Sequence, residues 1–337
     1  DPESIYLIDG ASKGVQTALR ILIADANDGI MVPIPQYPLY SATITLYEGK
    51  QVNYYLDEAH NWKLSKAMLE MSLQEAKRYG VRVKAICVIN PGNPTGYLYS
   101  QAELERLREI VLKHDLYLFA DEVYREFCYD GATHISAMTL AGLEQNVVLV
   151  DSVSKRYSMC GARVGAFITR NAELYASVLR FAQARLSPPT FGQIASEAAL
   201  NTPDSYFTGV IGEYVQRRDI LVDGLNTIPG VTCPKPKGAF YCVAELPIDD
   251  ADRFCQWLLE SFSHDGHTVM MAPCSGFYAD PATGRKQVRL AYVLEQPLLK
   301  KAVECLRAAL TAYPGTDKAA MSKAEAEAQS GEAAADR

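Results

Sequence analysis

The sequence lacks the features that would place a protein in a membrane or on a nucleic acid. Its 337 residues contain no run of about 18 consecutive apolar side chains, the length that a membrane-spanning helix requires. The formal net charge is −7, and no stretch is strongly basic. An acidic chain repels phosphate backbones and anionic lipid headgroups, so we expect neither nucleic acids nor membrane surfaces as partners.

Closely spaced cysteine pairs are also missing. The eight cysteines are scattered, and no two have the C-x-x-C spacing that is typical of zinc sites and dithiol redox motifs. Several lie in apolar runs such as "AICVIN" and are interpreted as small core residues. The opening "DPESIYLIDG" has neither the basic start nor the apolar segment of a signal peptide. We therefore expect no metal site and a reduced, cytoplasmic chain.

The sequence does contain an alternation of strand-like and helix-like segments. Short apolar runs rich in Val, Ile and aromatic residues predict buried strands at 29–35, 85–90, 116–123, 146–154 and 162–169. Other stretches predict helices at 12–26, 65–80 and 100–115, the last beginning with a capping box of Ser100 and Glu103. This order predicts an α/β fold with a largely parallel sheet, in which ligands bind at the carboxyl ends of the strands.

The character of the chain changes twice after this region. Near residue 225 a Pro- and Gly-rich stretch begins, followed by alternating strand-like and helix-like segments that predict a smaller α+β domain. After Gly315 the chain is rich in Ala and Glu and has no aromatic residue, which favours a disordered or frayed helical tail. We expect a large domain over 1–225, a small C-terminal domain over 226–315 and a tail over 316–337.

A lysine closely follows one of the apolar runs. In "VVLVDSVSKRYSMCGARVG", Lys155 comes after two serines, and Arg163 follows eight residues later. Taken alone, Lys155 is interpreted as a surface lysine, because lysine is rarely buried unless it is paired or chemically used. The chemical alternative is a Schiff base with an aldehyde, either a substrate carbonyl or pyridoxal 5'-phosphate (PLP).

Two loop segments could support such chemistry. Gly10-Ala11-Ser12 is a small-residue turn that leads into a helix, where backbone N–H groups can bind a phosphate. An ordinary Ser N-cap is the simpler interpretation of that turn. The string "NPGNPTG" over 90–96 follows an apolar strand, and its two prolines and two glycines predict a rigid loop that directs Asn93.

Two charged residues lie in apolar strand-like runs. Asp121 ends the strand of "ADEVY", where a buried carboxylate needs a cationic partner such as a protonated pyridine nitrogen. Arg289 in "VRLAYV" needs an anion, and a substrate carboxylate held by two parallel hydrogen bonds would satisfy it. An internal salt bridge is the alternative for Arg289.

The order of these motifs resembles the PLP-dependent class I/II aminotransferases of fold type I, which implies a seven-stranded sheet between helices and a smaller C-terminal domain. The resemblance covers residues 1 to about 314. The segment "PIPQYPLYSATI" is similar to alanine aminotransferases, and "INPGNPTG" with "SVSKRYSMCGARVGA" is similar to bacterial aspartate aminotransferase-like enzymes.

The resemblance implies a role for each motif residue. Lys155 would form the Schiff base and move the proton, Asp121 would pair with the pyridine nitrogen, and Tyr124 with Asn93 would bind the ring 3'-oxygen. Arg289 and Asn93 would bind the substrate carboxylate. The residues implied to hold PLP are Gly10, Ala11, Ser12, Tyr37, Asn93, Asp121, Tyr124, Ser152, Ser154, Lys155 and Arg163.

The implied activity moves an amino group between an L-amino acid, aspartate or alanine, and a 2-oxo acid such as 2-oxoglutarate, by way of pyridoxamine phosphate. A lyase or decarboxylase on the same scaffold and a catalytically silent PLP-binding module stay as alternatives. The resemblance also implies a homodimer, and it implies that an N-terminal arm that covers the site in relatives is missing here. A second arginine for dicarboxylic substrates is not evident, and Arg185 is a weak candidate.

Overall fold

The computed structural model describes residues 2–335, which form two compact units. The first unit runs to Asn93 and includes Tyr97–Thr208 and Lys237–Ala239. The second unit contains Pro94–Gly96, Gly209–Pro236 and the described residues from Phe240 onward. The division at 208 falls earlier than the boundary that the change in composition near 225 predicts. The reason is that helix α8 (Asp204–Asn226) runs through the division, and the Pro- and Gly-rich stretch begins only where that helix ends.

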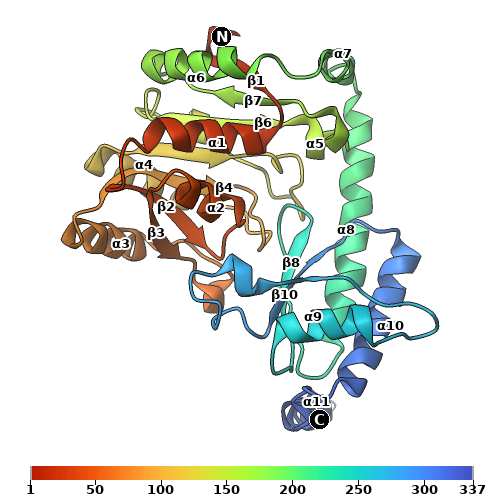
Figure 1. Ribbon diagram of the computed structural model, residues 1–337. Helices are drawn as coiled ribbons and strands as arrows, with labels where there is room; N and C mark the ends of the chain where they lie inside the picture. The colour runs from red at the N-terminus through yellow and green to blue at the C-terminus, as the bar shows by residue number, and fades with distance from the viewer. Residues whose placement is uncertain (1, 336–337) are drawn as a thin grey trace. The chain divides into compact units, whose positions relative to one another are not determined.

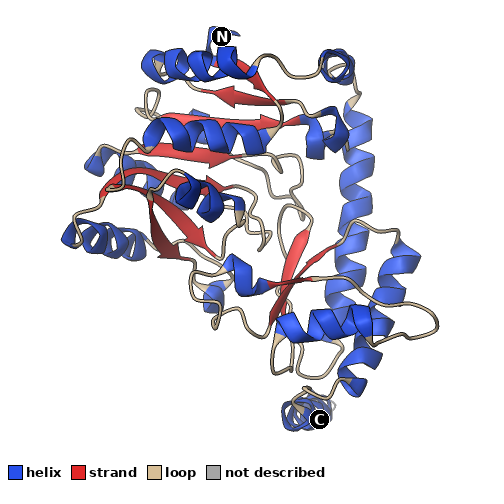
Figure 2. Ribbon diagram, viewed as in Figure 1, coloured by secondary structure: helices blue, strands red, loops and turns tan. Residues whose placement is uncertain are grey.

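The first unit is built on a seven-stranded sheet with the order β1-β7-β6-β5-β4-β2-β3 (Figures 1 and 2). The strands from β6 to β3 pair in parallel, whereas β7 is antiparallel to both of its neighbours. This confirms the predicted fold. The strands are β1 (Ile5–Ile8), β2 (Asp28–Ile34), β3 (Lys50–Tyr55), β4 (Arg82–Ile89), β5 (Tyr117–Asp121), β6 (Val147–Ser152) and β7 (Gly165–Ile168).

Two strands at the sheet edges were not predicted. Strand β3 is mostly exposed or half-buried and lacks an apolar run, whereas β1 is an apolar run of only four residues. Two predicted strands end early for local reasons. Strand β5 stops at Asp121, whose carboxylate accepts the Val123 amide at 3.3 Å. Strand β6 stops at Ser152, whose hydroxyl accepts the Ser154 amide at 3.1 Å and caps the short helix α5 (Val153–Arg156).

Helices cover both faces of the sheet, with α1 in front and α4 behind in Figure 1. Helices α1 (Ala11–Leu22), α2 (Leu39–Leu46) and α6 (Ala172–Arg185) contribute to one buried apolar cluster with alternate residues of the central strands. Helices α3 (Lys66–Arg78) and α4 (Gln101–His114) contact each other. Helix α4 begins with the predicted capping box of Ser100 and Glu103. Helix α7 (Thr190–Ala199) completes the unit.

The second unit contains a three-stranded antiparallel sheet with the order β8-β10-β9, which confirms the smaller α+β part. Its strands are β8 (Tyr241–Glu245), β9 (Ala272–Pro273) and β10 (Gln287–Ala291), and its helices include α9 (Ala251–Glu260) and α10 (Gln296–Ala312). Between residues 2 and 335, no helix combines the length and the apolar character needed to cross a membrane.

At the end of the chain the structure has the helical of the two alternatives, disordered or frayed helical, that the composition favours. Helix α11 covers Lys318–Ala335. Alanine, glutamate and lysine have high intrinsic helix propensity, so a segment that lacks core residues can still form a helix. The last part of the predicted tail, residues 336–337, lies outside the described residues.

Candidate active site

Strand register brings the Gly10 turn beside the end of β6. Gly165, the first residue of β7, pairs with Ile8 on one side and with Ser152 on the other. A Cβ atom on Gly165 would lie 2.7 Å from the Asp151 carbonyl oxygen and 3.0 Å from the Gly10 Cα. Only a glycine lets these three backbone segments approach so closely.

The turn itself requires glycine at its first position. Gly10 has a φ of 87°, and a Cβ there would collide with the Arg163 guanidinium. Arg163 donates hydrogen bonds to the carbonyls of Asp9 at 2.9 Å and Cys160 at 2.7 Å, which holds its positive charge at the start of α1. The first N–H groups of α1 have no acceptor within the helix, so this corner suits an anion.

Ser152 and Ser154 line the same corner from the other side. Their hydroxyl oxygens lie 2.8 Å apart, and the Ser152 hydroxyl donates to the Val164 carbonyl at 3.1 Å. These serines, the start of α1 and Arg163 form the anion cradle, the name used here for residues 10–12, 152, 154 and 163. Lys155 follows in α5 and is half-buried, with its Nζ 5.7 Å from the centroid of the Tyr124 ring.

Asp121 is buried at the carboxyl end of β5, with 7% of its surface exposed. Burial raises the pKa of its carboxyl to about 6, against the opposing effects of a hydrogen bond from Tyr40, the Val123 amide and the nearby charge of Lys155. Tyr124, three residues later, is also buried. The structure therefore places a carboxylate, an amine and a phenol at neighbouring positions along one edge of the sheet.

The loop after β4 is braced by a residue that the sequence did not single out. The side-chain oxygen of Asn90 accepts the Tyr99 backbone N–H at 3.2 Å, and the Asn90 backbone N–H donates to the Asp121 carbonyl at 2.9 Å. Asn93, which is buried, follows in this loop. Tyr37 lies in the loop between β2 and α2, and 36% of it is exposed.

A buried polar cluster beside Asp121 was likewise not predicted. Glu122 is 1% exposed, and its Oε1 accepts from the Ser136 hydroxyl at 3.1 Å and the Ala137 amide at 2.7 Å. Its Oε2 lies 3.6 Å from His134 Nε2. Burial raises the pKa of Glu122 to about 7 and lowers the pKa of His134 to about 4. Nothing in the local sequence reveals this pairing, because it depends on the course of the loop after β5.

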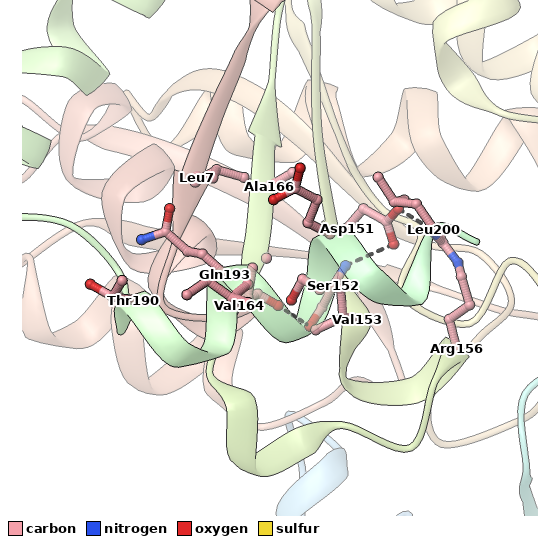
Figure 3. A pocket seen from close by; sticks show the side chains of 14 residues that line it. Leu7, Asp151, Ser152, Val153, Arg156, Val164, Ala166, Thr190, Gln193 and Leu200 are labelled. Atoms are coloured by element: carbon pink, nitrogen blue, oxygen red, sulfur yellow. Dashed lines mark hydrogen bonds and ion pairs between the residues drawn. The ribbon is translucent and has the colours of Figure 1, made fainter. Parts of the chain in front are cut away.

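The end of β6 carries a second buried carboxylate. Asp151 accepts the Ser152 amide at 2.7 Å and forms an ion pair with Arg156 at 2.6 Å, and Arg125 lies 3.5 Å away. These contacts fix the backbone from which Ser152 and Lys155 project. Figure 3 shows the Asp151–Arg156 pair beside a pocket of about 530 Å³. Most of its lining comes from α7 and from apolar residues of β1 and β7, and it shares only Ser152 with the anion cradle.

Two predicted arginines have well-defined surroundings. In the second unit, the Arg289 guanidinium lies 4.5 Å from the centroid of the Tyr241 ring and 5.0 Å from that of Phe277, so aromatic faces orient it. In the first unit, Arg185 forms an ion pair with Asp9 and donates to the Leu7 carbonyl at 3.4 Å. Asp9 thus binds the guanidinium that was a weak candidate for a distal substrate carboxylate.

The residues of the first unit fit PLP on three separate grounds. The anion cradle has the close backbone approach, made possible by Gly10 and Gly165, that a phosphate requires. Asp121 is a buried carboxylate that a protonated ring nitrogen would neutralise. Lys155 supplies an amine on the helix that the cradle serine Ser152 caps.

Comparisons with known proteins agree with this fit. The chain is 37% identical over 270 residues to a probable mitochondrial alanine aminotransferase of Dictyostelium discoideum, covering 73% of this chain and 50% of that protein. It is 37% identical over 267 residues to glutamate–glyoxylate aminotransferase 1 of Arabidopsis thaliana, covering 73% and 56%. The chain thus spans between half and about three fifths of the length of these curated relatives.

A solved structure resembles most of this chain. The aspartate aminotransferase of Rhizobium meliloti superposes with a TM-score of 0.79 at 29% identity, covering 92% of this chain and 76% of that one. The family model for aminotransferase class I and II matches residues 1–306. With its sheet, its anion cradle and its strand-end lysine and carboxylate, the chain belongs to the class I and II aminotransferase family, whose members depend on PLP.

Proposed function

We propose that this chain is a PLP-dependent aminotransferase that moves an amino group between an L-amino acid and a 2-oxo acid. The observation that carries the proposal is the register that places the anion cradle, Asp121 and Lys155 along the same edge of one sheet. A phosphate, a ring nitrogen and an aldehyde are the three groups of PLP that need a partner, and this edge offers one for each.

When bound, PLP supplies an electron sink for the carbanion that forms at the substrate α-carbon. The chain's own residues do the rest. The anion cradle would hold the phosphate, Asp121 would keep the ring nitrogen protonated, Tyr124 and Asn93 would bind the 3'-oxygen, and Tyr37 would stack on the ring. Lys155 Nζ would be the amine that holds the cofactor aldehyde, and the same amine would be the general base for the α-proton of the substrate.

For the substrate, we propose alanine or aspartate as amino donor and 2-oxoglutarate as acceptor. Alanine is supported by relatives that are named alanine aminotransferases, and aspartate by the similar aspartate aminotransferase structure. The glutamate–glyoxylate aminotransferase relative supports 2-oxoglutarate, because this is the 2-oxo acid that corresponds to glutamate. Arg289 would bind the α-carboxylate through two parallel N–H···O bonds. The two aromatic rings beside Arg289 support this role, because they limit the directions in which the guanidinium can point.

A half-reaction screen tests the activity. Protein loaded with PLP is mixed with alanine, aspartate, glutamate or an aromatic amino acid, and the products are identified by mass spectrometry. We expect a 2-oxo acid and pyridoxamine phosphate in equal amounts, with the largest yield from alanine or aspartate. Carbon dioxide with an amine would instead indicate a decarboxylase, and ammonia with a 2-oxo acid but without pyridoxamine phosphate would indicate a lyase. No product from any amino acid would indicate a silent PLP-binding module.

We also propose a homodimer. The support is a set of large apolar side chains exposed on β1 and on or beside α7: Leu7, Leu186, Phe191, Ile194 and Leu200. Phe191 alone has 87% of its surface exposed, and patches of this kind mark interaction sites. Light scattering should give twice the monomer mass for wild type and a lower mass for Phe191→Asp. A monomeric wild type would refute the proposal.

As compartment we propose the cytoplasm. All eight cysteines are free thiols, and six of them are buried, as in a reduced protein. Several relatives are named as mitochondrial, so fractionation of cells that express the tagged protein is the deciding measurement. Recovery of the protein in the mitochondrial fraction would show that the protein is mitochondrial and not cytoplasmic.

A further inference from the structure

A fully buried tyrosine of α2 contacts the carboxylate of β5. Tyr40 has 0% of its surface exposed, and its hydroxyl donates to Asp121 Oδ2 at 2.9 Å. Its ring meets Phe119 edge-on, with the centroids 6.1 Å apart. The hydroxyl therefore has a fixed direction, because the ring that carries it is held by packing on the same strand that carries Asp121.

A backbone acceptor would have satisfied this hydroxyl equally well. Tyr54, on strand β3 of the sheet that contains Asp121, is an example of that alternative. It is also 0% exposed, and its hydroxyl donates to the Cys87 carbonyl at 2.7 Å. A hydrogen bond to an ionised carboxylate is about twice as strong as a neutral one, and it favours the charged form of the acid. Tyr40 thus acts on Asp121 in a way that Tyr54 does not.

Burial works against the charge of Asp121, and its neighbours have mixed effects. Desolvation raises the pKa of the carboxyl to about 6, and the negative charge of Asp151 on β6 acts in the same direction. Tyr40 on α2, the Val123 amide and Lys155 on α5 lower this pKa. The Cys87 thiol on β4 faces the same carboxylate, and burial keeps it protonated by raising its pKa.

The two oxygens of Asp121 are used unequally. Oδ2 accepts from Tyr40, and Oδ1 accepts from the Val123 amide at the longer distance of 3.3 Å. A carboxylate offers about four acceptor positions. These two bonds therefore fix the plane of the carboxylate and leave room for a further donor.

We propose that Tyr40 is a positioning residue that keeps the Asp121 carboxylate ionised and oriented so that it can accept a hydrogen bond from the protonated ring nitrogen of PLP. This inference rests on the proposed function of Asp121 as the partner of that nitrogen. It predicts that removing one hydroxyl, remote from any reacting atom, changes the acidity of Asp121 and the protonation of the bound ring.

The test compares Tyr40→Phe with the matched control Tyr54→Phe, which removes an equally buried hydroxyl from a backbone acceptor. The pKa of Asp121 is measured in the PLP-free protein by carbon NMR of labelled aspartate, with Asp121→Asn assigning the signal. We expect Tyr40→Phe to raise this pKa by about one unit or more, and Tyr54→Phe to leave it unchanged. In protein loaded with ¹⁵N-labelled PLP, the nitrogen shift should show the shared proton moving from the ring nitrogen toward Asp121 in Tyr40→Phe only.

Each outcome decides the proposal. An unchanged Asp121 pKa in Tyr40→Phe, or an equal change in Tyr54→Phe, would overturn it whatever the activity. Should Tyr40→Phe not fold, Tyr40→Met fills the space without a hydroxyl and undergoes the same titration. The proposed aminotransferase function is refuted by a different measurement, in which wild-type protein releases no 2-oxo acid. The two failures are therefore distinguishable.

Discussion

The backbone of Gly165 lies against the turn at Gly10, and a Cβ atom on Gly165 would come within 3.0 Å of the Gly10 Cα. These residues are far apart in the sequence, yet their contact sets the width of the anion cradle. The same Cβ would lie 2.7 Å from the carbonyl of Asp151. Gly165 is therefore enclosed on both sides by backbone atoms, which cannot rotate away as a side chain can.

Gly165→Ala should therefore weaken PLP binding. Overpacking a tight site costs roughly 1–3 kcal/mol, which corresponds to about a fivefold to hundredfold increase in the Kd for PLP. Gly161→Ala is the matched control, since a Cβ on Gly161 has nothing within 4 Å in the same segment. Equilibrium dialysis with PLP measures both. Equal affinity in wild type and Gly165→Ala would show that the cradle does not depend on this contact.

Lys155→Ala should abolish the covalent attachment of PLP while leaving the fold and the anion cradle intact. Lys155 is half-buried beside the Tyr124 ring, and the cradle residues do not include it. After borohydride reduction, mass spectrometry should show the added cofactor mass on wild type and none on the variant. Lys13→Ala is the control, because Lys13 is a lysine on another helix, α1. This control protein should still gain the mass of the cofactor after reduction. If Lys155→Ala still carried the cofactor on the same peptide as wild type, Lys155 would not be the lysine that binds PLP covalently.

Arg289→Lys should raise KM for alanine and aspartate alike and also lower kcat. Lysine keeps the charge but cannot make two parallel N–H···O bonds. A hydrogen bond to a charged group is worth roughly 1.5–3 kcal/mol, so kcat/KM should fall about tenfold or more. Arg285→Lys is the control, because Arg285 pairs with Asp250 in the same unit.

The pattern of the loss in Arg289→Lys identifies the group that the arginine binds. A defect confined to aspartate would place Arg289 on the side-chain carboxylate of the substrate. Unchanged kinetics with both substrates would indicate that Arg289 forms an internal salt bridge and does not bind the substrate.

Glu122→Gln should stabilise the PLP-free protein at alkaline pH. In the folded chain the pKa of Glu122 is raised to about 7 from 4.5. Glu122 therefore contributes most to stability below pH 4.5, and this contribution is lost as the pH rises through 7. His134, whose pKa is lowered to about 4, acts oppositely and loses its contribution as the pH falls from 6.5 towards 4.

Glutamine keeps the acceptor for Ser136 and Ala137 and has no proton to lose. Relative to wild type, the unfolding free energy of Glu122→Gln should increase by on the order of 2 kcal/mol between pH 4.5 and pH 8. Urea denaturation at both pH values measures it, with the exposed Glu75→Gln as control. A pH-independent difference between Glu122→Gln and wild type would show that Glu122 is already ionised in the folded protein.

Much of the fold and the chemical identity of the site could be predicted from local patterns. Features that depend on consecutive residues can be recognised in the sequence. They include the buried central strands, the capped helix at Ser100 and the order of the motifs around Asn93, Asp121 and Lys155. The edge strand β3 was missed because its half-exposed residues form no apolar run, and β1 was missed because its apolar run has only four residues. The early ends of β5 and β6 were missed because single side-chain hydrogen bonds decide them.

By itself the sequence determined which groups are present: a lysine and a carboxylate after buried strands, small residues at a helix start, and an arginine in a later strand. Only the tertiary structure decided which of them meet. Strand order places Gly10, Gly165 and Ser152 side by side, and helix α2 brings Tyr40 to Asp121 across 81 positions of the chain. Such contacts depend on register and helix packing, which sum many weak interactions from distant segments and therefore leave no mark in any one stretch of sequence.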